Sequence, residues 1–271
     1  MALAPAADAS LTVSPPRVVL QVKSGKSQAG FFTLRNAGDE PLEITVEPED
    51  WAEGMGGARK PVSWLTVKPA ALTLAPGKEA RVKYTIRTPK DASGELRTQV
   101  FFTTKGVGPQ AMAMRSRLGA IVYVALEGTE QIAAEVTRIS AAYTAATPGV
   151  AQPDRLDVSV GILNKSNVHI VPEGRVILRG SKSERVAAVD FPQGWGLLPR
   201  EEDLYHAIGS GVYIKPGRYT AEVEVFYGAD VRKPKRTVKT FEAELAEDGS
   251  WRFSELVSAE AAAQPAASPS P

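Results

Sequence analysis

The chain has 271 residues, with 32 lysines and arginines against 31 aspartates and glutamates, so its net charge is +1. A chain of balanced charge has no general attraction to a phosphate backbone, which disfavours nucleic acid as a partner. It contains no cysteine and two histidines, which excludes disulfides and thiolate chemistry and disfavours histidine-based metal sites. Its 43% of hydrophobic residues suffices for packed domains, while no apolar run is long enough for membrane insertion.

The first ten residues, MALAPAADAS, are small and mostly uncharged. They resemble the cleavage end of a secretory signal without its charged and apolar parts. We therefore expect a periplasmic protein whose signal peptide is missing or trimmed. An ordinary disordered N-terminus explains the same residues equally well.

Alternation of apolar and polar side chains runs through most of the chain and predicts antiparallel strands with one solvated face. Leu42, Ile44 and Val46, for example, are separated by polar residues. Turn sequences rich in Asn, Gly and Pro divide these runs. In chain order, we expect strands at 16–22, 29–36, 41–47, 71–74, 80–87, 96–104, 110–125, 131–144, 156–163, 174–179, 185–190, 202–208, 217–227 and 237–245.

Seven short strands in each half predict an all-β fold of two tandem immunoglobulin-like β-sandwich domains, over 10–127 and 131–247. A weak internal repeat supports the duplication, because the run into Asn36 has the spacing of the run into Asn164. Pro-Gly turns at 76–77 and 216–217 also each precede an alternating strand. The segment 256–271 is rich in Ala, Pro and Ser, and we expect a disordered C-terminal tail.

A search for catalytic motifs finds no phosphate-binding glycine loop, nucleophile elbow or zinc-protease motif. His169 and His206 both fall in strand-like segments, where we expect half-exposed positions. The acidic run EPEDW at 47–51 is expected to be a solvated loop, since a calcium site needs six to eight oxygen ligands. We therefore expect no enzyme, no cofactor and no metal.

The run QAMAMRSRLGAIVYVA at 110–125 is unusually long for a strand. Met112 and Met114 share one side-chain parity, and Met is an adaptable residue suited to an intermolecular surface. A long edge strand offers unpaired N–H and C=O groups to a partner strand. The alternative is that the whole run pairs within its own sandwich and that the Met side chains fill gaps in the core.

Five segments of the first half, in this order and spacing, resemble the periplasmic pilus-assembly (fimbrial) chaperones, a family with two immunoglobulin-like domains. The resemblance covers residues 10–127. The segments are PPRVVL at 15–20, GFFTLRNAGDEPLEITVEPEDW at 30–51, VKPAALTLAPGKEARVKYT at 67–85, TPKDASGELRTQVFF at 88–102 and MAMRSRLGAIVYV at 112–124.

The resemblance implies a chaperone that binds pilus or surface-fibre subunits by β-strand addition along the last strand of its first domain. The donor side chains would be Gln110, Met112 and Met114. The family anchors the subunit's terminal carboxylate with an Arg and a Lys; Arg17 matches the Arg, while Gly119 stands at the Lys position and Arg117 is the candidate substitute. Pilin-like subunits and an outer-membrane usher are the partners that this implies.

A second interpretation stays open. The chain would then be a non-catalytic structural envelope protein with two immunoglobulin-like modules, and residues 108–118 would be paired within the protein.

Overall fold

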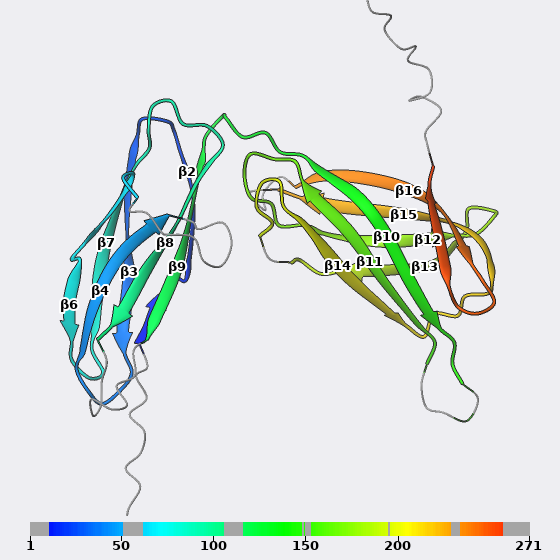
Figure 1. The fold of residues 1–271 in the computed structure, drawn as a ribbon, viewed down its shortest axis with the longest axis horizontal. Coiled ribbons are helices and arrows are strands. Elements are labelled where there is room, and N and C mark those ends of the chain that lie inside the picture. Colours follow the sequence, from blue (N-terminus) through cyan, green and yellow to red (C-terminus); the bar gives the residue numbers. More distant parts are fainter. Residues whose placement is uncertain are drawn as a thin grey trace, which may run out of the picture. The chain divides into compact units, whose positions relative to one another are not determined.

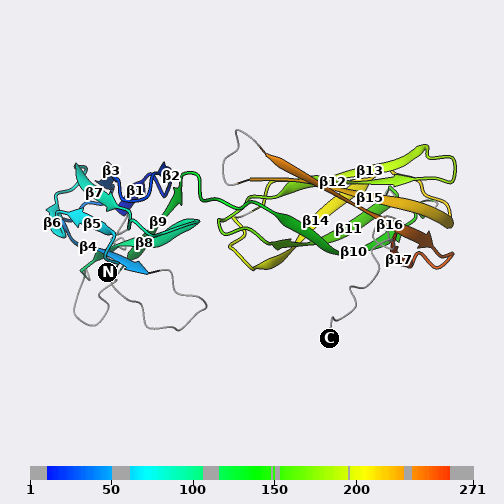
Figure 2. The ribbon, with the colours of Figure 1, turned by 90° about the horizontal axis from the view of Figure 1, so that it is seen from above.

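The computed structural model describes residues 11–50, 62–105, 116–147, 149, 153–194, 196–228 and 234–256. These residues form seventeen strands, and the chain divides into two compact units between Glu130 and Gln131. Within them, no helix has the length and hydropathy needed to span a membrane. Each unit is a sandwich of two facing sheets (Figures 1 and 2).

The first unit has a four-stranded sheet in the order β1-β3-β7-β5 and a five-stranded sheet in the order β2-β9-β8-β4-β6. These orders correspond to the A-B-E-D and C-F-G sheets of the immunoglobulin fold. The strands are β1 (Leu11–Ser14), β2 (Arg17–Val22), β3 (Ser27–Asn36), β4 (Leu42–Asp50), β5 (Leu65–Lys68), β6 (Ala71–Leu74), β7 (Glu79–Arg87), β8 (Glu95–Thr104) and β9 (Arg117–Leu126).

The core of the first unit follows the alternation in the sequence. Leu42, Ile44 and Val46 are at most 2% exposed, whereas the residues between them face solvent. Phe32 is fully buried at the centre, against the rings of Tyr84 at 5.0 Å and of Phe102 at 5.5 Å between centroids. One apolar face of each sheet thus makes this core, as the period of two requires.

The second unit has a three-stranded sheet in the order β10-β11-β14 and a five-stranded sheet in the order β13-β12-β15-β16-β17. An isolated bridge between Ala142 and Ser250 joins the two sheets at one side. The strands are β10 (Ala134–Thr144), β11 (Arg155–Asn164), β12 (Glu173–Arg179), β13 (Arg185–Phe191), β14 (Glu202–Ser210), β15 (Gly217–Tyr227), β16 (Lys235–Leu245) and β17 (Trp251–Glu255).

The internal repeat has a structural basis in one buried asparagine per unit. Asn36 is fully buried, and its Nδ2 donates to the C=O groups of Glu40 (2.7 Å) and Leu74 (3.0 Å). Its Oδ1 accepts the N–H of Gly38 at 3.0 Å. Two of these bonds satisfy backbone groups of the turn after β3, and the third ties that turn to the end of β6.

Asn164 repeats the arrangement in the second unit. It is fully buried, and its Nδ2 donates to the C=O groups of Val168 (2.9 Å) and Leu197 (2.8 Å). Its Oδ1 accepts the N–H of Ser166 at 2.8 Å. The two asparagines therefore hold equivalent turns, one after β3 and the other after β11.

The Pro-Gly part of the predicted repeat is wrong. The N–H of Gly77 donates to the C=O of Asn36 (2.9 Å), and the N–H of Arg200 donates to the C=O of Asn164 (2.8 Å). Both residues are left-handed, with φ of 67° and 68°. The counterpart of Pro76–Gly77 is therefore Pro199–Arg200, rather than 216–217, and the absence of a glycine there concealed it.

The all-β class and the two immunoglobulin-like sandwiches are confirmed, and the fourteen expected strands all have a counterpart in the structure. The count of seven strands per half is wrong, because β1, β5 and β17 were not expected. The strands β1 and β5 have four residues each and stop at a proline. Of the expected tail, residues 257–271 lie outside the described residues.

Candidate functional site

The last strand of the first unit, β9, is partnered on both sides along only part of its length. On one side it pairs with β8 from Arg117 to Ala125, and on the other it pairs with β2 from Ile121 to Leu126. Along Arg117–Ala120, no strand in the described part of the chain pairs with β9 on the side away from β8. This stretch is a sheet edge without a hydrogen-bonded neighbour strand.

The hydrogen bonds on either side show which backbone groups face that edge. The C=O of Ser116 accepts the N–H of Thr104 in β8 (2.9 Å), while the N–H of Ile121 donates to Pro16 on the opposite side (3.0 Å). Because successive residues of a strand bond in opposite directions, Leu118 and Ala120 bond β8. The N–H and C=O groups of Arg117 and Gly119 therefore point out of the open edge.

The edge exists because the first strand of the domain is divided between the two sheets. The piece β1 pairs with β3 in one sheet, and the piece β2 pairs with β9 in the other. Pro15 and Pro16 lie between them, where the chain crosses over. The crossing ends the cover of β9 at Ile121 and leaves the four residues before it bare on that side.

Arg117 is held on the outer face of this sheet by an aromatic ring and a carboxylate. Its guanidinium lies 3.8 Å from the centroid of the Phe101 ring and forms an ion pair with Glu49 in β4. Phe101 is paired with Gly119, and a Cβ at Gly119 would lie 3.2 Å from that ring. The absence of a side chain at Gly119 thus gives Phe101 its place beneath Arg117.

Arg17 lies on the same face at the other end of the open stretch. It is opposite Ile121, and its guanidinium is 5.0 Å from the centroid of the Tyr123 ring. Since β9 advances about 3.3 Å per residue, Arg17 and Arg117 are separated by roughly 13 Å along the strand. The two guanidinium groups therefore lie over different rings. Of Gly119 and Arg117, the two candidate positions for the second anchor, Gly119 is the nearer to Arg17.

The donor-strand residues of the sequence prediction, Gln110, Met112 and Met114, lie outside the described residues. What the structure gives is the face of the strand that follows them. Ala120, Val122 and Val124 are fully buried and point into the core of the first sandwich. By the period of two, Met112 and Met114 have the parity of these core residues in the sequence.

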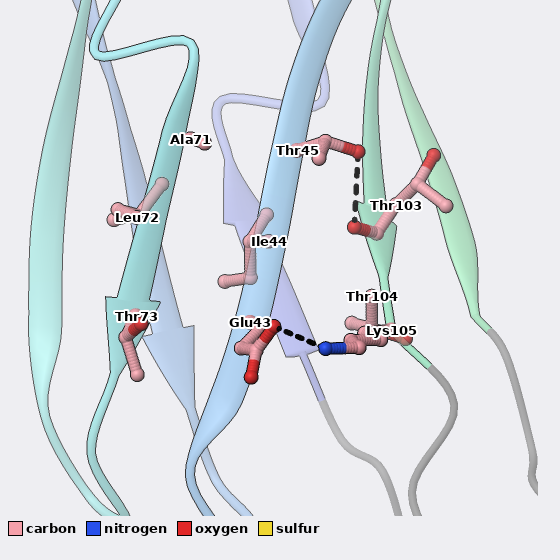
Figure 3. Close-up of a pocket in the computed structure, with 9 residues that line it drawn as sticks. All are labelled: Glu43, Ile44, Thr45, Ala71, Leu72, Thr73, Thr103, Thr104 and Lys105. Carbon is pink, nitrogen blue, oxygen red and sulfur yellow. Dashed lines mark hydrogen bonds and ion pairs between the residues drawn. The ribbon is translucent and has the colours of Figure 1, made fainter.

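A shallow hollow of about 610 Å³ lies on the same sheet, over β4, β6 and β8 (Figure 3). Its floor is formed by small side chains such as Thr45, Ala71 and Thr103, and an ion pair between Glu43 and Lys105 (3.0 Å) crosses it. Among its lining residues there is no nucleophile paired with a base. The hollow offers a surface for contact rather than groups for a reaction.

The histidines are placed differently from each other. His169 is 1% exposed in the turn region after β11, so the expected half-exposed strand position is wrong. His206 is exposed in β14, and its Nδ1 shares a hydrogen bond with Ser159 Oγ (2.8 Å). The nearby Asp157 is bonded to Arg155, and that bond lowers the pKa of Asp157. A serine–histidine–aspartate relay is therefore not assembled at this pair.

Residues 47–50 of the acidic run are strand rather than the expected loop, and residue 51 lies outside the described residues. Glu47, Glu49 and Asp50 belong to β4, and Glu49 is the partner of Arg117. Within the described residues, no group of three or more His, Asp or Glu side chains is arranged to hold a metal ion. Pairing of β4 with β8 continues through Pro48 to Asp50, beyond the expected end of this strand at residue 47.

No protein-family model matches the chain, and no curated protein matches it. Among solved structures, the chain is similar to the class 5 fimbriae chaperone CfaA, at 13% identity over 85% of this chain and 98% of that chain, with a TM-score of 0.47. It is similar to a chaperone–tip adhesin complex of CFA/I fimbriae biogenesis at 13% identity over 85% and 98% of the chains, with a TM-score of 0.46. It is also similar to the E. coli chaperone DraB, at 16% identity over 87% of this chain and 98% of that chain, with a TM-score of 0.42.

These similarities are too distant to carry a conclusion about the chain, and its fold rests on the strand order and register described above. They do place fimbrial chaperones among the structural neighbours.

Proposed function

We propose that this chain is a periplasmic, chaperone-like protein that binds pilus or surface-fibre subunits by β-strand addition beside β9. The observation that supports this function best is the open edge at Arg117–Ala120, where the N–H and C=O groups of Arg117 and Gly119 face outward. An added strand would take up these groups and continue the sheet β9-β8-β4-β6. The subunit would gain main-chain hydrogen bonds and cover for its own exposed core.

The side chains extend the binding surface beyond the described edge. Gln110, Met112 and Met114 precede the edge in sequence, and we propose them as the donor residues that enter the subunit. Thioether side chains adapt to irregular apolar pockets, which suits binding to several related subunits. An outer-membrane usher is the further partner that such a role calls for.

Arg17 and Arg117 are the proposed carboxylate anchors. A terminal carboxylate arriving beside Arg117 would compete with Glu49, and an Arg can bind a carboxylate through two parallel hydrogen bonds. Arg17 borders the same open stretch from the β2 side. Because the two are roughly 13 Å apart along the strand, we propose that one guanidinium takes the carboxylate and the other a second group of the subunit chain.

Amide hydrogen exchange in the isolated protein tests the edge itself. We expect fast exchange at Arg117 and Gly119 and slow exchange at Leu118, Ala120 and Ile121, because the last three bond β8 or Pro16. Equal protection of all five amides would contradict an available edge and would favour the structural envelope protein.

A proline at Gly119 tests strand addition. Gly119→Pro deletes an N–H that points outward, so the ladder with β8 stays whole, whereas Gly119→Ala adds the same Cβ and keeps the N–H. Co-expressed with a fibre subunit, wild type and Gly119→Ala should form a complex that survives gel filtration, and Gly119→Pro should not. Met112→Arg with Met114→Arg should also abolish the complex. Binding by all variants alike would overturn the proposed function.

A further inference from the structure

The second unit also has a long strand that is hydrogen-bonded to a neighbouring strand on one side only. In the first unit β7 is paired by β3 and β5, whereas its counterpart β14 is paired by β11 alone. Within the described residues no strand of the second unit takes the place of β5. Figure 1 shows β14 at the margin of its sheet. Its nine residues exceed the usual strand length of five or six.

The backbone groups on the bare side belong to the even-numbered residues of β14. The N–H of Asn164 donates to Glu201 (2.9 Å), and the N–H of Gly211 donates to Asp154 (2.7 Å). Glu201 and Gly211 lie just beyond the two ends of β14, and the pairing between β11 and β14 runs without a shift from one to the other. Because alternate residues bond the same neighbour, the backbone groups of all odd-numbered residues of β14 point toward β11. The N–H and C=O groups of Leu204, His206 and Ile208 therefore face away from the sheet.

The same residues put apolar side chains on the outer face. Leu204 is 40% exposed and Ile208 is 56% exposed, with His206 between them. The ring of His206 is fixed by its hydrogen bond to Ser159. Exposed sheet edges are usually protected by lysine, proline or a bulge. Between Leu204 and Ser210, β14 has no charged residue and no proline.

We propose that β14 pairs with β14 of a second copy of this chain, antiparallel and centred on His206. The two three-stranded sheets then form one continuous sheet. In this register Leu204 lies opposite Ile208 of the second copy, and His206 lies opposite His206. The even-numbered residues, which point outward, face even-numbered residues of the second copy, so every outward N–H and C=O of Leu204, His206 and Ile208 finds a partner.

The side chains select this register over its neighbours. A shift by two residues would set Leu204 against His206 or against Ser210 and leave an exposed apolar side chain without an apolar partner. In the centred register Glu202 faces Ser210 and Asp203 faces Gly209, so no two carboxylates oppose each other. A single pair of strands is a small interface, and the dimer is therefore weak and depends on concentration.

Single-cysteine cross-linking tests the register, because the chain contains no cysteine of its own. Facing residues in the centred register have Cα atoms about 5.5 Å apart, so His206→Cys should give a covalent dimer with a short bis-maleimide. Ser210 faces Glu202 of the second copy, so the Ser210 residues of the two copies are eight residues apart along the strand, roughly 27 Å. Ser210→Cys should therefore stay monomeric. Equal cross-linking of both variants, or none of either, would overturn the proposal.

Sedimentation over a concentration series tests the pairing without any cross-linker. The wild type should dimerise, and Leu204→Lys with Ile208→Lys should remain monomeric, because each lysine would face the other position of the partner. The matched control is Val238→Lys, which charges another exposed apolar position of the second unit at 40% exposure and should dimerise like the wild type. A wild type that is monomeric at every concentration, or a double variant that dimerises equally, contradicts the proposal.

Discussion

At the scale of single residues, Asn36 and Asn164 hold the turns that join the two sheets of each sandwich. Each is fully buried, and each makes three hydrogen bonds to the backbone, two to carbonyl groups and one from an N–H. Neither turn has another side chain in the described structure that takes over these bonds. The cost of losing one asparagine is therefore the cost of leaving buried backbone groups unpaired.

We expect Asn164→Ala to lower the free energy of unfolding by about 2–4 kcal/mol, since it removes three hydrogen bonds in a buried site. Asn164→Asp keeps the acceptor for Ser166 but turns a carboxylate toward two carbonyl oxygens, and it should cost at least as much. Urea unfolding of the three proteins measures this. A loss near zero for Asn164→Ala would show that water or a neighbour replaces the side chain.

The left-handed backbone of Arg200 gives a prediction of opposite sign. Its φ of 68° is one that glycine adopts freely and other residues adopt at a cost of about 1–2 kcal/mol. Arg200→Gly should therefore stabilise the protein, by about 0.5–1 kcal/mol after the added freedom of the unfolded chain is subtracted.

Gly77→Ala is the matched control in the first unit. Its φ is 67°, and no atom lies within 4 Å of the added Cβ, so its cost of about 1–2 kcal/mol would come from the backbone alone. Thermal unfolding compares both variants with the wild type. Arg200→Gly without any gain would contradict the strain assigned to this position.

At the scale of strands, the outer face of β15 carries a buried charge between two neighbouring strands. Glu224 is 3% exposed and forms ion pairs with Arg175 of β12 and Arg236 of β16. Burial by itself raises the pKa of Glu224, but the hydrogen bonds and charges of the two arginines outweigh it and lower the pKa below its ordinary value of 4.5. The native protein thus binds this proton less readily than the unfolded chain.

The stabilisation from Glu224 is therefore complete above its ordinary pKa and is lost as the pH falls through the lower native value. We expect Glu224→Gln to cost about 1.5–3 kcal/mol at neutral pH and progressively less in acid. Glu222 lies on β15 like Glu224, and its ion-pair partner Arg179 of β12 is half-exposed. Glu222→Gln should therefore cost at most about 1 kcal/mol. Urea unfolding at several pH values checks this, and a pH-independent cost for Glu224→Gln would contradict it.

At the scale of the whole molecule, the two units have separate apolar cores. One core draws on residues from Leu11 to Val124 and the other on residues from Val136 to Leu245, with no member in common. Each is large enough to sustain an independent sandwich of ordinary domain size. The units meet in sequence between Glu130 and Gln131.

We therefore expect residues 1–130 and 131–271, produced separately, each to show the circular dichroism of β-sheet and a single cooperative unfolding transition. The expected reason is that every strand pair of the described structure lies within one unit. Calorimetry of the two fragments and of the full chain measures this. A fragment without a cooperative transition would show that its core depends on the other half.

The sequence by itself determined the parts of this protein that depend on short-range patterns. Alternation placed Leu42, Ile44 and Val46 in the core and fixed the all-β class, because neighbouring side chains of a strand necessarily point to opposite faces. The same alternation is present at Trp251 and Phe253 in β17, directly after the turn at 247–249. The strands β1 and β5 were too short for the pattern to show.

The tertiary structure alone decided which strands are neighbours, and with them the candidate sites. That β2 covers β9 only from Ile121, that Arg117 lies over Phe101 beside Glu49, and that β14 has one bare side all depend on contacts between residues far apart in the chain. The equivalence of Arg200 with Gly77 was likewise invisible in the sequence, because hydrogen bonds to a buried asparagine define it. Period and composition specify a strand and its faces, whereas an open edge exists only through the absence of a neighbour, which is settled when the sheets assemble.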